Sequence, residues 1–212
     1  MTEDKGSVAR LLEALRGGNA AVQGELLLRY EPWLRLLAQV QVESRFNGKF
    51  DTADIVQQTL LEAVRALPGL RASTEAELIA WLRQVLAHVI AHEVRRYRGT
   101  LQRDLGREVS LERSIAKSSQ RLRDVVAAPG SSPSQHAARR EREVLLADAL
   151  AQLPEDYRQV IILRNIEGLP HEEVARRMGR SPGAVRMLWV RALARLKELA
   201  EGMGLSATDA VS

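Results

Sequence analysis

The spacing of three residues in the C-terminal part constrains the fold of this chain more than any other feature. Ala175 is followed four residues later by Gly179, and Val185 comes six residues after that. A small residue where two helices cross, a turn glycine and a β-branched anchor at these offsets are typical of a helix-turn-helix. Ser181 is a suitable N-cap for the second helix, and Pro182 fits its first position. We therefore predict two short helices joined by a tight turn.

The second of these helices carries several arginines and no acid before Glu198. Val185, Trp189, Ala192 and Leu196 have the spacing of a buried face, which leaves the basic residues pointing outward. In a helix-turn-helix this helix lies in the DNA major groove, where arginine matches both guanine edges and phosphate oxygens. The alternative is a plain helical hairpin with a solvated basic face. On the first interpretation, the DNA-contacting residues in and beside a motif at about 171–190 are Arg176, Arg177, Arg180, Ser181, Ala184, Arg186, Met187, Arg191 and Arg195.

The composition favours helices over strands. Of the 212 residues, 45% are hydrophobic and only 4% are aromatic, so leucine, alanine and valine must form the core. Arginine and glutamate are abundant, and no segment shows the alternation of a strand. We expect an all-α protein.

Several classes of function lack the residues that they need. The chain has no cysteine, which excludes a disulfide framework, a thiolate nucleophile and a cysteine-ligated metal. It has no phosphate-binding glycine loop and no Ser/His/Asp arrangement. We expect no enzymatic activity, cofactor, metal or small-molecule substrate. Since no apolar run could span a membrane, we also expect no membrane partner and a cytoplasmic location.

Breaks in the helical periodicity divide the chain into two small helical domains joined by a flexible linker. The first domain covers 1–99. The pattern is lost over 100–135, which ends in the linker-like sequence APGSSPSQ. It resumes over 136–204, a compact domain of four short helices that includes the helix-turn-helix. The tail, 205–212, is expected to be disordered.

The first domain is expected to contain four helical segments. The first is a short amphipathic helix over 7–16, and the second, over 20–42, contains Pro32, which should bend it or begin a new segment. In the third helix, over about 51–67, the apolar positions expected to face inward are Ile55, Val56, Leu60, Leu61 and Val64.

The fourth segment, ELIAWLRQVLAHVIAHEVRRYRG, is a long helix that ends in a basic cluster. Tyr97 lies within this cluster, so the segment could bind a nucleic-acid backbone and stack a base. A solvated helix end is the alternative, because cations there also suit the helix dipole. The two histidines of this helix are four residues apart, but no third metal ligand lies near them in sequence. The residues singled out are His88, His92, Arg95, Arg96 and Arg98.

The segment DIVQQTLLEAV combines an apolar stripe with Asp54, Gln57 and Gln58 on another face. An ordinary amphipathic helix explains this pattern by itself. The same face would also suit a protein partner.

Taken in order, these segments resemble the extracytoplasmic-function (ECF) group of the bacterial sigma-70 family, the promoter-recognition subunits of RNA polymerase. The likeness runs from Val8 to Glu201, and LPEDYRQVIILRNIEGLPHEEVARRMGRSPGAVRMLWVRALARL is its most specific part. This part resembles the domain that reads the promoter −35 element. AWLRQVLAHVIAHEVRR resembles the helix that engages and opens the −10 element. Leu188, Trp189 and Val190 depart from the residues common in the family's recognition helix, so no promoter sequence can be transferred.

The resemblance implies a function and partners. The protein would bind core RNA polymerase and promoter DNA, and the family allows an anti-sigma factor as a further partner. DTADIVQQTLLEAVRAL resembles the polymerase-clamp helix, which assigns polymerase binding to Asp54, Gln57, Gln58 and Leu61. The −10 role falls on His88, His92, Arg95, Arg96 and Arg98, and the −35 role on the helix-turn-helix residues above.

Two other classes of protein fit parts of the sequence. A stand-alone helix-turn-helix regulator would bind duplex DNA without polymerase, and would be expected to carry a ligand or receiver domain. An RNA-binding or purely structural helical protein would need neither partner. Co-purification with core polymerase distinguishes the sigma factor from both.

Overall fold

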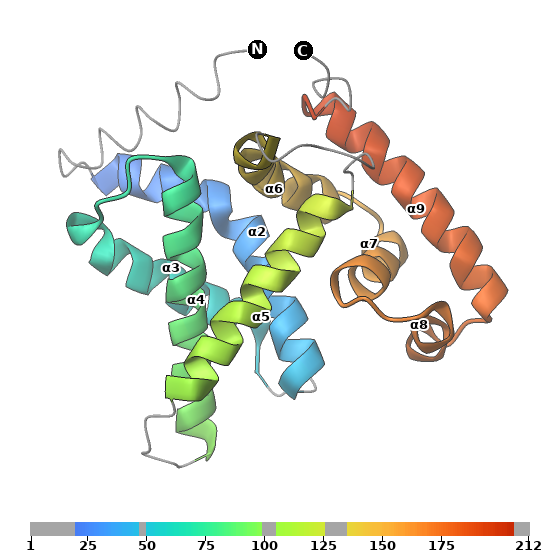
Figure 1. Cartoon of the computed structure of the whole chain (residues 1–212), viewed down its shortest axis with the longest axis horizontal. Helices are drawn as coiled ribbons and strands as arrows, with labels where there is room; N and C mark the ends of the chain where they lie inside the picture. Colours follow the sequence, from blue (N-terminus) through green and yellow to red (C-terminus); the bar gives the residue numbers. More distant parts are fainter. Residues whose placement is uncertain (1–19, 47–49, 99–104, 126–134, 206–212) are drawn as a thin grey trace. The chain divides into compact units, whose positions relative to one another are not determined.

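The computed structural model describes residues 20–46, 50–98, 105–125 and 135–205, and their regular structure is entirely helical (Figure 1). The chain divides into two compact units, Met1–Ala116 and Lys117–Ser212, which we call the N-terminal and C-terminal units. The all-α fold class expected from the composition is confirmed. The helix expected over 7–16 and the tail after Leu205 lie outside the described residues.

The N-terminal unit is built on three long helices, α2 (Ala20–Phe46), α3 (Thr52–Ala66) and α4 (Glu75–Arg98). α3 packs against both α2 and α4 (Figure 1). Most of the buried side chains of this unit are aliphatic, and they are joined by Tyr30 and Trp33 of α2, whose rings meet edge to face at 6.5 Å. The helix α2 continues through Pro32 and does not begin a new segment there.

Capping side chains fix where α3 and α4 begin. The carboxylate of Asp51 accepts a hydrogen bond of 2.7 Å from the backbone of Ala53. At the start of α4, Thr74 and Glu77 form a capping box, in which each side chain accepts a bond from the other's backbone N–H at 3.2 Å. Hydrogen bonds from the backbone and hydroxyl of Ser73, followed by those from Thr74, lower the pKa of Glu77.

The inward face of α3 is narrower than the sequence predicted. Ile55 and Val56 are buried as expected, but Leu61 and Val64 are 44% and 41% exposed. The buried stripe continues instead through Thr59 and Ala63, which are both completely buried, and the Thr59 hydroxyl donates to the Ile55 carbonyl at 2.7 Å. Because the hydroxyl bonds to a carbonyl of its own helix, a polar residue can occupy a core position, and the buried stripe of the helix is shifted accordingly.

The helix α5 (Leu105–Asp124) lies where the sequence predicted an irregular linker, and that expectation is wrong for these residues. Its buried positions include Leu111, Ile115 and Leu122, but Ser118 and Ser119 occupy the turn between them and are buried as well. Because serines occupy these buried positions, the apolar residues of the segment do not show a helical period in the sequence. The division between the two units falls within α5, after Ala116.

The C-terminal unit contains the expected four-helix arrangement. Its elements are α6 (Gln135–Ala151), α7 (Glu155–Ile161) with the π-helical turn η2 (Ile162–Ile166), α8 (His171–Met178) and α9 (Pro182–Gly202). The helix α9 packs against α6, α7 and α8 (Figure 1). Arg121, from the end of α5, donates to the carbonyls of Ile166 and Glu167 at 3.0 and 2.7 Å, and so satisfies acceptors at the end of η2.

A membrane-spanning segment requires a long apolar helix, and none of the helices in the described ranges meets that requirement.

Candidate nucleic-acid interface

The helix-turn-helix is present in the C-terminal unit with the predicted geometry. Ala175 and Val185 are buried, and Gly179 between them has a left-handed backbone with φ of 62° and ψ of 33°. This conformation ends α8, and the backbone N–H of Arg180 bonds back to the Ala175 carbonyl at 2.9 Å. A side chain at position 179 would be strained by this φ. The glycine therefore sets the sharp turn from α8 into α9.

The start of α9 also follows the sequence prediction. The Ser181 hydroxyl accepts a hydrogen bond of 3.2 Å from the backbone of Ala184, and Pro182 occupies the first helical position. No acid is present in the first turn of α9. The positive end of the α9 dipole is therefore not neutralised by an acidic side chain in the first turn of the helix.

The inner face of α9 anchors it in the unit. Val185, Ala192 and Leu196 are completely buried, as predicted. Trp189 is only partly buried, contrary to the expectation of a plain core residue. Its indole N–H donates to Asn165 Oδ1 at 2.8 Å, and its ring meets that of His171 edge to face at 5.5 Å.

His171 is held in its neutral form beside Trp189. Burial, and then the positive charges of Arg164 and Arg186, lower the pKa of His171 from its ordinary value of 6.5. The nearby carboxylate of Glu172 opposes this effect. A neutral ring therefore supports the tryptophan at neutral pH.

Every residue that the sequence proposed for −35 DNA is exposed in the C-terminal unit. Several of the arginines are nevertheless paired with acids from other parts of the unit. Arg186 on α9 pairs with Glu172 on α8 at 3.3 Å, and Arg180 in the turn pairs with Asp156 on α7. The remaining pairs are Arg176 with Glu173, Arg177 with Glu167 and Glu173, and Arg195 with Glu198.

Arg191 differs from these residues, because it has no ion-pair partner within the described part of the chain. Because the other arginines have acidic partners, the surface around α9 carries both positive and negative side chains, although the sequence of the helix looked uniformly basic. The Arg186–Glu172 and Arg180–Asp156 pairs are exposed on both sides, so each contributes about 0–1 kcal/mol and can exchange for a phosphate contact at that cost. Arg177 differs, because the side chain of its partner Glu167 is only 5% exposed. Sequence reasoning missed these acids, because Asp156 and Glu172 lie outside the recognition helix.

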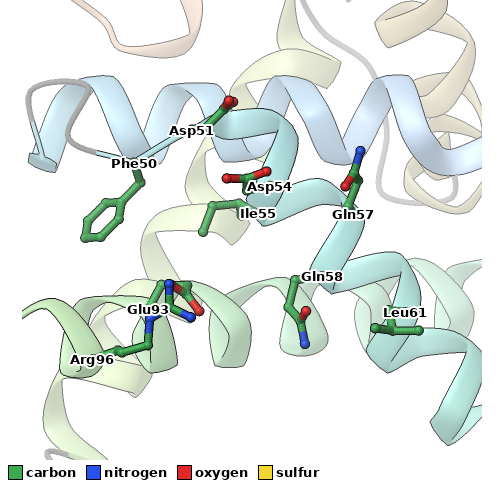
Figure 2. A pocket seen from close by; sticks show the side chains of 9 residues that line it. All are labelled: Phe50, Asp51, Asp54, Ile55, Gln57, Gln58, Leu61, Glu93 and Arg96. Carbon is green, nitrogen blue, oxygen red and sulfur yellow. The ribbon is translucent and has the colours of Figure 1, made fainter.

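The residues proposed for polymerase binding lie together along α3 in the N-terminal unit. A surface pocket of about 800 Å³ is lined by Asp54, Gln57, Gln58 and Leu61. Figure 2 shows these side chains on the α3 side of the pocket, with Glu93 and Arg96 on the α4 side. Asp54 and Gln57 are exposed, and Gln58 donates to Glu62 at 3.0 Å.

The pocket connects two groups that the sequence treated separately. Arg96, proposed for −10 DNA, lines it together with the polymerase-binding residues. Arg96 pairs with Glu93 at 3.2 Å, and the ring of His92 lies 3.6 Å from the same carboxylate. Phe50 and Glu93 also line the pocket, although no local sequence signal identified them.

The other residues proposed for −10 DNA lie along α4. His88, His92 and Arg96 are exposed, and Arg95 is half-buried. The side chains of Tyr97 and Arg98 lie outside the described residues. Positions 88, 92, 95 and 96 have the spacing of one helix face, so a ligand lying along α4 would meet them together.

The sequence of this chain is similar to those of known proteins. Residues 143–196 match the family described as Sigma-70, region 4. The chain is 44% identical over 75 residues to the ECF RNA polymerase sigma factor ShbA of Streptomyces griseus, an alignment that covers 32% of this chain and 39% of that protein.

Two further relatives align along most of the chain. The ECF RNA polymerase sigma-E factor of Haemophilus influenzae is 27% identical over 188 residues, or 86% of this chain and 89% of the relative. The ECF RNA polymerase sigma factor SigD of Mycobacterium tuberculosis is 28% identical over 190 residues, or 90% and 82%. Residues 143–196 thus match region 4 of the sigma-70 family, and along most of its length the chain is similar to ECF RNA polymerase sigma factors.

Proposed function

We propose that this chain is an RNA polymerase sigma factor that binds core polymerase, recognises the −10 and −35 elements of a promoter and promotes DNA melting. The observation that carries the proposal is the helix-turn-helix with its outward basic helix, within the segment that matches region 4. The relatives, which are named sigma factors, support it.

The C-terminal unit is assigned the −35 element. The helix α9 is anchored by its inner face, and its exposed arginines can reach both base edges and phosphates. Arg176, Arg177 and Arg180 lie on α8 and the turn, where they are suited to phosphate contacts beside the groove. Each phosphate contact made by a self-paired arginine must first displace a carboxylate, which costs about 0–1 kcal/mol for an exposed pair.

The N-terminal unit is assigned polymerase binding and the −10 element. Its face of α3 offers Asp54, Gln57 and exposed Leu61 to a protein partner, and α4 presents exposed histidines and arginines to DNA. Through Glu93 and Arg96, the pocket places the end of α4 against the α3 face. Polymerase binding at α3 should therefore influence how α4 meets DNA.

This role needs no catalytic residue, cofactor or small-molecule substrate in the sigma factor itself. It places the protein in the cytoplasm, where RNA polymerase transcribes. An anti-sigma factor is a further partner under this proposal.

Reconstitution with core RNA polymerase tests the proposal. The full chain should co-elute with core enzyme, and the complex should start transcripts at specific sites on genomic DNA of the source organism. Core enzyme alone should not do so. Specific binding of the free chain to duplex DNA, without affinity for core polymerase, would instead establish a stand-alone helix-turn-helix regulator.

A further inference from the structure

The outward face of α9 carries an exposed apolar pair. The side chains of Met187 and Val190 are 55% and 53% exposed, although they lie in the N-terminal half of a basic helix. They are three residues apart and therefore neighbours on the helix surface. Arg191 lies four residues after Met187 and so borders the same strip. Single exposed apolar residues are ordinary, but this pair occupies the direction opposite the buried Val185 and Leu196.

The major groove of DNA offers one apolar group for such a pair. The 5-methyl group of thymine is the apolar feature that distinguishes base edges there, and the other edge groups are hydrogen-bond donors or acceptors. Methionine is flexible and polarizable, so it adapts to a methyl group at several positions. In a helix-turn-helix, the first turns of the second helix approach the bases most closely.

We propose that Met187 and Val190 are specificity-determining residues that contact thymine methyl groups in the −35 element, beside a base or phosphate contacted by Arg191. This inference rests on the proposed function and adds the kind of base that the chain selects. The −35 element should accordingly contain thymine at one or two adjacent positions beneath the N-terminal half of α9.

The charges around the pair favour DNA over a protein as its occupant. Exposed Arg186, Arg191 and Arg195 border the strip, and Arg191 has no acidic partner in the described ranges. A rim of this sign complements the phosphates on either side of the major groove. An apolar protein surface would satisfy Met187 and Val190, but it would leave Arg191 without an anionic partner, whereas Arg186 and Arg195 already pair with Glu172 and Glu198.

Deoxyuridine provides a direct test, because it keeps thymine's base pairing and lacks only the methyl group. Holoenzyme assembled from the full chain and core polymerase would first select a −35 duplex from a randomised library. Each thymine of the selected duplex would then be replaced singly by deoxyuridine, and the Kd of the holoenzyme measured. Loss of one buried methyl contact should weaken binding by about fourfold at one or two positions.

The same titrations with Met187→Ala, Val190→Ala and Met187→Gln identify the side chain responsible. Each alanine variant should bind the thymine duplex about fourfold more weakly, and should show no further loss at its own deoxyuridine position. Leu28→Ala is the matched control, because Leu28 is 63% exposed in the N-terminal unit, and it should keep the full deoxyuridine effect.

Two results would overturn the inference while leaving the proposed function intact. One is a parent holoenzyme that binds its selected promoter equally well with deoxyuridine at every position. The other is an equal deoxyuridine effect in the parent and in both alanine variants. A loss of affinity for core polymerase in Met187→Ala, with promoter selectivity unchanged, would assign the pair to a protein contact. Failure of the parent chain to join core polymerase would instead count against the proposed function itself.

Discussion

The indole N–H of Trp189 donates a hydrogen bond of 2.8 Å to the Oδ1 atom of Asn165. The bond connects α9, the second helix of the helix-turn-helix, to the π-helical turn η2, and the edge-to-face contact of Trp189 with His171 connects α9 to the start of α8. These contacts hold α9 at one rotation about its axis. The direction of its outward arginines therefore depends on a side chain that itself faces inward.

The Asn165–Trp189 bond should contribute measurably to the stability of the C-terminal unit. Asn165→Ala and Trp189→Phe are each expected to lower the free energy of unfolding by about 1 kcal/mol, since each removes one partner of a partly buried hydrogen bond. Urea unfolding of the full chain measures the change. The double variant should be little worse than either single variant, whereas additive losses would contradict a direct coupling.

Full truncation of Trp189 should cost more than loss of the bond. Truncation of a fully buried aromatic residue costs roughly 3–5 kcal/mol. Because the indole of Trp189 is only partly buried, we expect Trp189→Ala to lower the free energy of unfolding by less, about 2–3 kcal/mol. Circular dichroism during thermal unfolding measures the loss. A change below about 0.5 kcal/mol would show that the ring does not anchor α9.

The lowered pKa of His171 predicts a pH-dependent stability. Because the folded pKa lies below the unfolded value of about 6.5, the unfolded state binds the proton more readily. Stability should therefore be full above about pH 7.5, fall as the pH drops through 6.5, and stop falling below the folded pKa. Urea unfolding between pH 8 and pH 5 should show this loss in the parent chain and a smaller one in His171→Phe, which keeps a ring beside Trp189. Identical pH profiles would refute the assignment.

The end of α5 is held to the C-terminal unit by a buried carboxylate. Glu143 is completely buried, accepts a bond from the Ser119 hydroxyl and pairs with Arg123 at 2.6 Å. Arg123→Met should lower the free energy of unfolding by about 3–5 kcal/mol, because it leaves a buried charge without its cation. Exposed Arg113 on the same helix provides the control, and Arg113→Met should change stability by less than about 0.5 kcal/mol.

A double variant distinguishes the charge from the packing at this site. Arg123→Met with Glu143→Met should regain most of the lost stability, because it removes the uncompensated carboxylate as well. Chemical denaturation of the single and double variants provides the comparison. A double variant as unstable as Arg123→Met would show that packing, and not the unpaired charge, causes the loss.

The helix-turn-helix was predictable from sequence because its determinants are local. Ala175, Gly179 and Val185 lie within eleven consecutive residues, and backbone sterics alone require a residue such as glycine at the left-handed turn. The helix α5 was missed because Ser118 and Ser119 occupy buried positions, and the partner of Ser119, Glu143, is more than twenty residues away.

The electrostatics of the candidate site could not be read from its own sequence. Glu172 and Asp156, the partners of Arg186 and Arg180, become neighbours only when α7, α8 and α9 pack together. The sequence of α9 therefore predicted the position of Arg186 but not its partner on α8, whereas the partner of Arg195, Glu198, lies on α9 itself. The same limit applied to Trp189, whose inward direction followed from helical spacing while its hydrogen bond to Asn165 did not.

The exposed face of α3 should bind core polymerase. Asp54→Arg combined with Gln57→Arg is expected to abolish co-elution with core enzyme, while the free energy of unfolding changes by only about 0.5 kcal/mol, because both positions are exposed. Glu25→Arg, an exposed charge reversal on α2, serves as the control and should bind like the parent. Unchanged affinity of the double variant for core polymerase would remove the assignment of this face.

The arginines of α9 should differ in how they affect promoter binding. Arg191 has no acidic partner in the described part of the unit, whereas Arg186 must exchange Glu172 for DNA. Arg191→Ala and Arg186→Ala should each weaken holoenzyme binding to a cognate promoter by about 1–3 kcal/mol for a base contact, and less for a phosphate contact. Glu172→Gln should strengthen binding, because it removes the competing carboxylate. Lys117→Ala, an exposed loss of positive charge at the start of the C-terminal unit, should leave the affinity unchanged.

Salt dependence separates the two kinds of arginine contact. A lost phosphate contact should reduce the slope of log K against log salt by about 1, because fewer counterions are released on binding, and its effect should shrink as salt rises. A lost base contact should relax selectivity at one position of the −35 element. Titration of the parent and variant holoenzymes at several salt concentrations measures both quantities. Parent-like binding by both arginine variants across the salt series would show that the basic face of α9 is only a solvated surface.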